Sequence, residues 1–169
     1  MWHLLYNVLL LTASPFILVI LLAKQRCRRG LPQRLGLESS RPNRPDRPNE
    51  PDRPDKPVIW IHAVSLGEVV AVTPLVKELH RRYPNHRLIV PTVTETGREA
   101  VEQRLAGLAE HLYAPLDFPW VVSRLVARLR PVLYLFIETE LWPNLLRTLH
   151  RQGVPTVMVY GWLSSRSFG

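Results

Sequence analysis

The sequence has very little cysteine: Cys27 is its only thiol, so no disulfide can form within the chain. A single thiol fits a reducing compartment. No set of cysteines and histidines has the spacing of a zinc site. The Walker motif and the GxGxxG dinucleotide fingerprint are also missing. These absences exclude a disulfide-stapled fold and leave metal-dependent or nicotinamide-dependent chemistry without support in the sequence.

Acidic residues are too few to balance the basic ones. There are 22 Lys and Arg against 14 Asp and Glu, so the net charge is +8. The chain of 169 residues is long enough for one domain with a real core. Such a charge predicts an anionic partner: nucleic acid, a phosphate-rich substrate or an acidic membrane surface. Aromatic residues are not interleaved with basic ones, so nucleic-acid binding rests on net charge alone.

Residues 4–23 are almost all apolar and have about the length that spans a bilayer core. Cations follow this run at once, namely Lys24, Arg26, Arg28 and Arg29. Because such clusters mark the cytoplasmic side, we predict a membrane anchor helix over residues 1–23, with the rest of the chain in the cytosol. A helix lying in the membrane interface is the alternative. A cleaved signal peptide is disfavoured, because the charges follow the apolar run.

Residues 24–57 are predicted to be a linker, basic at first and then rich in proline. Residues 41–57 read RPNRPDRPNEPDRPDKP, from which no core can be built. This composition favours polyproline II geometry and a semi-rigid spacer. A recognition motif for a proline-binding partner is the alternative.

From residue 58 onward, strand patterns alternate with helix patterns. This alternation predicts a doubly wound, parallel α/β sheet over residues 58–169. Thr96 has capping-box spacing and is predicted to begin the second helix, and Asp117 precedes Pro119 as a helix-start signature. The predicted strands are 58–61, 88–93, 112–114, 132–137 and 156–160, and the predicted helices are 69–83, 96–108, 119–129 and 141–151.

Carboxylates, hydroxyls and glycines follow the predicted strands. Right-handed crossovers place the carboxyl ends of all strands at one edge, where open α/β folds bind ligands. The residues expected there are Ser65, Gly67 and Glu68; Thr92, Thr94, Thr96 and Gly97; Asp117; Glu138, Thr139 and Glu140; and Gly161, Ser164 and Ser165. Because these side chains are expected together at the carboxyl edge of the sheet, the sequence predicts a ligand-binding site there.

Glu68 is the strongest candidate for chemistry. It falls in the first turn of a helix, where the helix dipole stabilises a negative charge, and a carboxylate at the rim of a cleft can act as a general base. The SLG and TETG turns could present backbone N–H groups to a phosphate or carboxylate. The plainer interpretation is that Glu68 and the pair Glu138 and Glu140 are only charges at helix N-termini. His62 is interpreted as a core histidine with satisfied hydrogen bonds, in preference to a ligand.

Five motifs resemble one family. In chain order they are HAVSLGE at 62–68, TVTETG at 92–97, PLDFP at 115–119, FIETELWPN at 136–144 and LSSRS at 163–167. Together they resemble the N-terminal half of a 3-deoxy-D-manno-octulosonic acid (Kdo) transferase of lipopolysaccharide synthesis. The apolar N-terminal run followed by basic residues resembles the membrane anchor of that family. The resemblance covers nearly the whole chain except the proline-rich spacer.

The resemblance implies the N-terminal, Rossmann-like domain of a GT-B glycosyltransferase. The family transfers Kdo from CMP-Kdo to a lipid A precursor, without a metal or other cofactor, at the cytoplasmic face of the bacterial inner membrane. Glu68 carries over as the general base. Ser65, Gly67, Thr94, Thr96 and Gly97, with Glu138 and Glu140, are expected to bind the acceptor or support the transition state.

The sequence also departs from the family pattern. Tyr160, Gly161 and Trp162 stand where the family has asparagine, alanine and arginine, and the proline-rich insert is unusual. A chain of this length is too short for both domains, so we expect the donor-binding domain to lie outside it, with a separate donor-domain chain as one source. The alternatives are a membrane-anchored scaffold that lacks catalysis and, more weakly, a nucleic-acid-binding domain.

Overall fold

The computed structural model describes residues 2–23, 30–37, 56–137 and 141–159. Helices and strands alternate from residue 58 onward, as the sequence predicts. Their bounds are α1 Trp2–Ala23, α3 Leu31–Arg34, β1 Val58–His62, α4 Leu66–Arg82, β2 Arg87–Thr92, α5 Glu95–Arg104, β3 Glu110–Tyr113, α6 Pro119–Leu129, β4 Pro131–Ile137, α7 Pro143–Arg151 and β5 Thr156–Val159.

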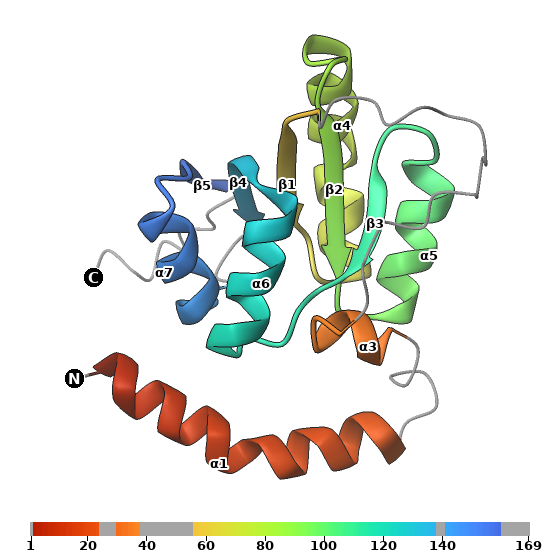
Figure 1. Ribbon diagram of the computed structural model, residues 1–169. Coiled ribbons are helices and arrows are strands. Elements are labelled where there is room, and N and C mark those ends of the chain that lie inside the picture. The colour runs from red at the N-terminus through yellow and green to blue at the C-terminus, as the bar shows by residue number, and fades with distance from the viewer. Residues whose placement is uncertain (1, 24–29, 38–55, 138–140, 160–169) are drawn as a thin grey trace, which may run out of the picture.

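The strands form one parallel sheet in the order β3-β2-β1-β4-β5 (Figure 1). This confirms the predicted α/β class and gives a Rossmann-like strand order. β1 lies at the centre, and all five of its residues are buried. Because both faces of the sheet are covered, residues 58–61 of β1 form an uninterrupted apolar run and do not alternate with polar residues. The strand order reverses between β1 and β4, which places the topological switch point at their carboxyl ends.

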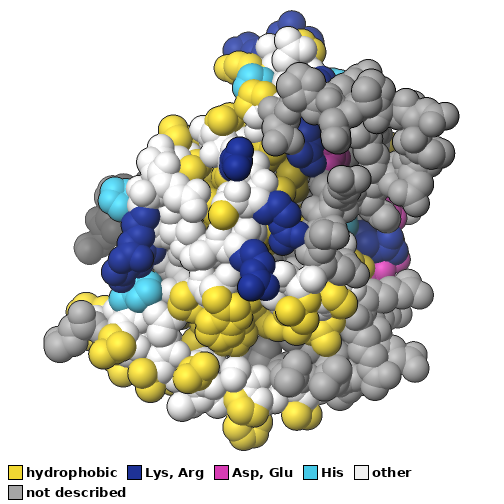
Figure 2. Space-filling model, in the orientation of Figure 1, with side chains coloured by type: hydrophobic (Ala, Val, Ile, Leu, Met, Phe, Trp, Pro, Cys, Tyr) yellow, Lys and Arg dark blue, Asp and Glu magenta, His cyan; other side chains and the backbone are white. Residues whose placement is uncertain are grey.

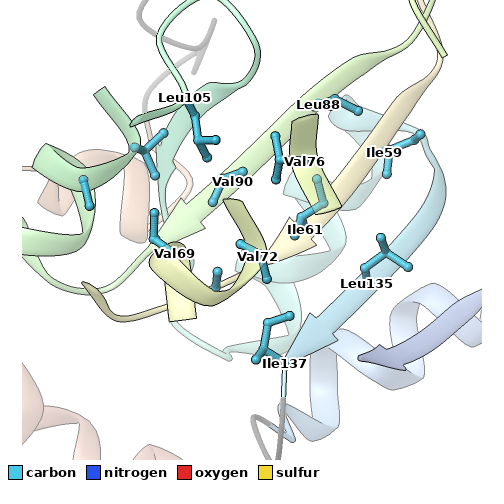
Figure 3. Packing of buried hydrophobic residues seen from close by; sticks show 13 residues of the cluster. Ile59, Ile61, Val69, Val72, Val76, Leu88, Val90, Leu105, Leu135 and Ile137 are labelled. Atoms are coloured by element: carbon cyan, nitrogen blue, oxygen red, sulfur yellow. The ribbon is translucent and has the colours of Figure 1, made fainter. Parts of the chain in front are cut away.

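Helices α4 and α5 cover one face of the sheet, and α6 and α7 cover the other (Figure 1). Successive side chains of a strand point to opposite faces. Ile59 and Ile61 therefore join α4 and α5 in one buried cluster (Figure 3), whereas Val58 and Trp60 join α6 and α7 in the other. The two clusters hold the central strand between them and so fix where its carboxyl end lies.

Three helix starts differ from the prediction, one of them that of α7, which begins at Pro143 and not at 141. α4 begins at Leu66, before the predicted position 69, because Ser65 caps it. The prediction that Thr96 caps the second helix of the α/β domain is wrong: Thr94 is the N-cap of α5, and Thr96 lies in the first turn. A capping side chain must come from a residue with extended backbone, and Thr94 has that geometry, with φ −100° and ψ 151°.

Helix α1 lies beside the carboxyl edge of the sheet (Figure 1). The Tyr6 hydroxyl donates to Asp117 at 2.9 Å, and the Asn144 amide donates to Asn7 at 2.8 Å. Hydrophobic side chains on the other side of α1 are exposed and gather at the lower end of the molecule (Figure 2). Among the described residues, no helix is long and apolar enough to cross a membrane. The predicted spanning helix is therefore not supported.

Candidate active site

The turn after β1 holds Glu68 by a reciprocal capping arrangement. Ser65 is the N-cap of α4, and its hydroxyl oxygen accepts from the Glu68 N–H at 3.4 Å. In return, the Glu68 carboxylate accepts from the Ser65 hydroxyl at 2.6 Å and from the Val64 N–H at 2.9 Å. This is a capping box in which the returning carboxylate reaches one residue further back than usual. Both carboxylate oxygens are thereby fixed in place, and Glu68 stays partly exposed.

The turn after β2 is bonded directly to the turn after β1. The Val64 carbonyl accepts from the Val93 N–H at 2.9 Å and from the Thr94 N–H at 3.4 Å. The structure therefore brings together the predicted site residues of the first two strands, which are far apart in sequence. Their shared contact is backbone to backbone, so it does not depend on which side chains stand in the turns.

Gly97 and Gly67 differ in what surrounds them. A Cβ at Gly97 would lie 2.9 Å from the Thr94 hydroxyl oxygen and 3.0 Å from the Thr92 Cβ, so a larger residue would displace the cap of α5. The Gly97 N–H donates to the Thr94 hydroxyl at 3.1 Å. A Cβ at Gly67 would meet no atom within 4 Å of the described structure. The first helical turn of α4 is thus open, whereas that of α5 is closely packed.

An ionic cluster that sequence reasoning missed lies beside the second turn. The Glu95 carboxylate accepts from the Tyr113 hydroxyl and from Arg98, both at 2.7 Å. Burial, followed by the hydrogen bond to Glu95, raises the pKa of Tyr113 to about 12. Glu95 stands inside the TETG motif, so the motif itself was the signal that could have identified it.

Arg34 completes this cluster from a distant part of the chain. It is only 3% exposed, donates to the Val93 carbonyl at 2.6 Å, and places its guanidinium 4.8 Å from the centre of the Tyr113 ring. Arg34 belongs to the short helix α3, inside the segment that the sequence assigns to the linker. The sequence around Arg34 carries no pattern that predicts its burial, because its partners Val93 and Tyr113 lie 59 and 79 residues away.

Asp117 lies at the carboxyl edge as predicted, but it caps a different helix from the one that it precedes. Its carboxylate accepts from the N–H groups of Asn144 at 3.0 Å and Leu145 at 2.9 Å, in the first turn of α7. Burial raises the pKa of Asp117, and these hydrogen bonds and that from Tyr6 oppose the rise. Because its carboxylate bonds to Tyr6, Asn144 and Leu145, which are all groups of the fold, its position is that of a structural carboxylate.

The remaining predicted site residues lie outside the described residues. They are Glu138, Thr139, Glu140, Gly161, Ser164 and Ser165. The strand that leads to the ETE motif is described: Phe136 of β4 pairs with His62 of β1 in the sheet register. The candidate site is therefore defined here by the turns after β1 and β2, on one side of the switch point.

A cavity of about 460 Å³ lies at the opposite edge of the sheet. Its lining includes His86, Arg87 and Glu110, which stand at the amino ends of β2 and β3. Arg87 and Glu110 form an ion pair at 2.8 Å across these ends. Since ligands of open α/β folds bind at carboxyl ends, we do not assign the candidate site to this cavity. Among the described residues, no cluster of His, Cys, Asp and Glu could hold a metal ion.

The sheet order defines a Rossmann-like α/β domain, with Glu68 in a polar turn at the carboxyl edge of the sheet. The sequence profile described as 3-deoxy-D-manno-octulosonic-acid transferase (kdotransferase) matches residues 29–169. The chain therefore belongs to the Kdo transferase family, as the motifs predict.

Named relatives agree with this family. The chain is 36% identical to the 3-deoxy-D-manno-octulosonic acid transferase of Haemophilus influenzae, over 99% of this chain and 38% of the relative. It is 40% identical to that of Bordetella pertussis over 64% of this chain and 26% of the relative. A probable mitochondrial transferase of Arabidopsis thaliana is 31% identical over 66% and 25%. The chain thus spans well under half the length of these relatives.

Proposed function

We propose that this chain is the acceptor-binding part of a glycosyltransferase that moves Kdo from CMP-Kdo to a lipid A precursor, with Glu68 as the general base. The single observation that carries the proposal is the fixed carboxylate of Glu68 at the ligand-binding edge, in a chain of the Kdo transferase family. Neither a metal nor another cofactor enters the proposal.

The geometry around Glu68 suits a base that must be in place before its substrate arrives. Each oxygen accepts one hydrogen bond, from Val64 or Ser65, and a carboxylate has about four acceptor sites. Sites therefore stay open to take the proton of an acceptor hydroxyl as that oxygen attacks the sugar. Fixing the carboxylate beforehand lowers the entropy cost of reaching the reactive arrangement.

The turn after β2 is proposed to support the acceptor. Thr94 and Thr96 are exposed and stand at the N-terminus of α5, where N–H groups and the helix dipole favour a phosphate or carboxylate. Gly97 keeps this turn tight. Glu138 and Glu140, which follow β4 in sequence, are proposed to contribute to the same acceptor side. A bis-phosphorylated lipid would also be attracted by the net charge of +8.

We place the protein at the cytoplasmic face of the inner membrane, with α1 as the contact to lipid. The exposed side of α1 is formed by large apolar side chains, including Trp2, Leu5, Leu9 and Phe16. Tyr6 and Asn7 hold the other side to the carboxyl edge, so a lipid acceptor in the bilayer would lie near Glu68. The cations Lys24, Arg26, Arg28 and Arg29 that follow α1 in sequence suit an anionic surface.

We propose that CMP-Kdo binds to a donor domain, which corresponds to the part of the relatives that this chain does not cover. The chain alone would then bind the acceptor weakly and turn over too slowly for a full transferase. A donor domain, in the same polypeptide or a separate chain, would restore transfer. Sustained transfer by residues 1–169 alone, at a rate near that of a full-length relative, would contradict this division.

The test is a transfer assay with the chain supplemented by a donor domain from a relative, read by mass spectrometry of the lipid. Glu68→Gln keeps an acceptor for the Val64 N–H but removes the base, so the Kdo mass gain should fall at least 100-fold. Glu78→Gln, which removes an exposed carboxylate further along α4, is the matched control and should keep full transfer. A Glu68→Gln chain as active as wild type would refute the role of Glu68.

The second candidate is a membrane-anchored scaffold that binds without catalysing. The capping role of Glu68 favours it, because a purely structural carboxylate would have the same contacts. A scaffold should bind acceptor lipid equally well as wild type and as Glu68→Gln, and neither should give transfer with any donor domain. Salt-dependent binding to duplex DNA by the same chain would favour the nucleic-acid alternative instead.

A further inference from the structure

His62 is a fully buried histidine at the carboxyl end of β1. Neither of its ring nitrogens has a hydrogen-bond partner among the described residues. The predicted core position of His62 is confirmed, but the prediction that its polar atoms are satisfied there is wrong for the described residues. Burying polar nitrogens is costly when they are not hydrogen-bonded. The contacts that stabilise this side chain are therefore those of its ring.

The contacts of His62 link the two strands at the switch point. In the sheet register it lies opposite Phe136 of β4. Its ring also meets the ring of Trp142 edge to face, with centroids 4.7 Å apart and planes at 80°. This is a favourable arrangement for two aromatic rings. Residues 136 and 142 stand on either side of the ETE motif in sequence, so His62 lies opposite one of them in the sheet and packs against the ring of the other.

Trp142 is in turn the residue from which α7 begins. Trp142 occupies the N-cap position of α7, but its side chain makes no capping hydrogen bond. The Asp117 carboxylate instead accepts from the N–H groups of Asn144 and Leu145. The start of α7 is thus held by Asp117 on one side and has the His62 ring against its capping residue. Three residues after His62, Ser65 begins the turn that fixes Glu68.

We infer that His62 is a positioning residue of the proposed transferase: its ring holds Trp142, and with it the start of α7, at a fixed place against the carboxyl end of β1, from which the Ser65–Glu68 turn continues. The inference rests on the proposed function for its catalytic meaning, but the contact can be tested without it. Burial lowers the pKa of His62 to about 3, so the ring that packs on Trp142 is neutral at neutral pH.

The first test is amide hydrogen exchange at Asn144 and Leu145 in the full chain, which needs no substrate. We expect His62→Ala to speed exchange at these two amides about tenfold more than it speeds exchange in β1. His62→Phe keeps an aromatic ring and should restore protection to within about threefold of wild type. Leu129→Ala is the control. It opens the buried cluster beneath α6 and α7 at the far end of α6, and it should not speed amide exchange at the start of α7.

Coupling between the two rings is tested by a double-mutant cycle. If His62 acts through Trp142, then His62→Ala adds little to Trp142→Ala, and the double variant loses about tenfold in protection. A hundredfold loss, the product of two independent effects, would overturn the inference. Equal local loss in Leu129→Ala would overturn it too, because the effect would then be general loosening of the core.

The catalytic consequence is read in the supplemented transfer assay. We expect His62→Ala to lower kcat about tenfold with little change in the KM for CMP-Kdo, and His62→Phe to recover most of it. An unchanged kcat beside faster exchange at α7 would overturn the positioning role in catalysis. If wild type itself gives no transfer, the proposed function fails, whereas the exchange result still decides whether His62 positions α7.

Discussion

Asp117 stabilises the helix that begins 26 residues after it, by accepting hydrogen bonds from the Asn144 and Leu145 N–H groups. Pro143, at the first position of α7, has no N–H, and Trp142 provides no side-chain cap. The orphan amides at the second and third positions therefore depend on a carboxylate from another loop. A helix start that adjoins the ETE motif is thus fixed by a tertiary contact.

Asp117→Ala should destabilise the fold more than loss of an ordinary cap. Two buried N–H groups would lose their acceptor, and each such group costs about 1–3 kcal/mol. We expect the free energy of unfolding to fall by about 2–4 kcal/mol, measured by urea denaturation followed by circular dichroism. Asp117→Asn keeps one acceptor oxygen and should lose less. A loss within 0.5 kcal/mol for Asp117→Ala would contradict the capping role.

Tyr6→Phe tests the attachment of α1. The substitution removes the hydroxyl that donates to Asp117 and leaves the ring in place. The expected loss is about 1 kcal/mol of docking free energy, so α1 should exchange its amides about fivefold faster. Tyr83→Phe, on the exposed end of α4, is the control. Equal exchange in α1 for wild type and Tyr6→Phe would mean that the hydroxyl does not hold the helix.

Thr94 and Thr96 provide a matched pair. Thr94 is the N-cap of α5 and accepts from the Gly97 N–H, whereas Thr96 is exposed in the first turn. Thr94→Ala should therefore cost about 1 kcal/mol of unfolding free energy, and Thr96→Ala less than about 0.5 kcal/mol. Thermal unfolding of both variants decides this. A larger loss of unfolding free energy for Thr96→Ala than for Thr94→Ala would mean that Thr96 is the cap.

One buried and one partly buried histidine predict a loss of stability in mild acid. Burial lowers the pKa of His62 to about 3, and burial with the positive charges of Arg98 and Arg34, against the opposing Glu95, lowers that of His111 to about 4. Below pH 6.5 the unfolded chain binds protons that the folded chain does not, so stability falls as pH falls. Each histidine contributes up to about 1.4 kcal/mol per pH unit.

The measurement is urea unfolding between pH 6.5 and 5, above the range where most carboxylates titrate. His62→Phe and His111→Gln should each flatten the pH dependence, because each removes one of the two groups. Stability that rises as pH falls through this range would reverse the predicted sign.

Much of this protein could be predicted from the sequence because the deciding interactions are local. The apolar run at 58–61, the helical stripe with Val72 and Val76, and the hydroxyl three residues before Glu68 all act over a few residues. Their alternation with turns indicates a parallel sheet, and that predicts a shared edge for Ser65, Glu68 and Thr94. Family membership likewise followed from short motifs in order.

Tertiary structure alone decided which distant groups meet. Asp117 precedes α6 in sequence but caps α7. Arg34, which belongs to a segment with linker composition, packs against the ring of Tyr113. Helix α1 lies along the edge of the sheet. That the nitrogens of His62 have no hydrogen-bond partner among the described residues is visible only once β1, β4 and Trp142 are in place. Such contacts depend on the packing of whole elements, and a local pattern carries no record of which element will pack beside it.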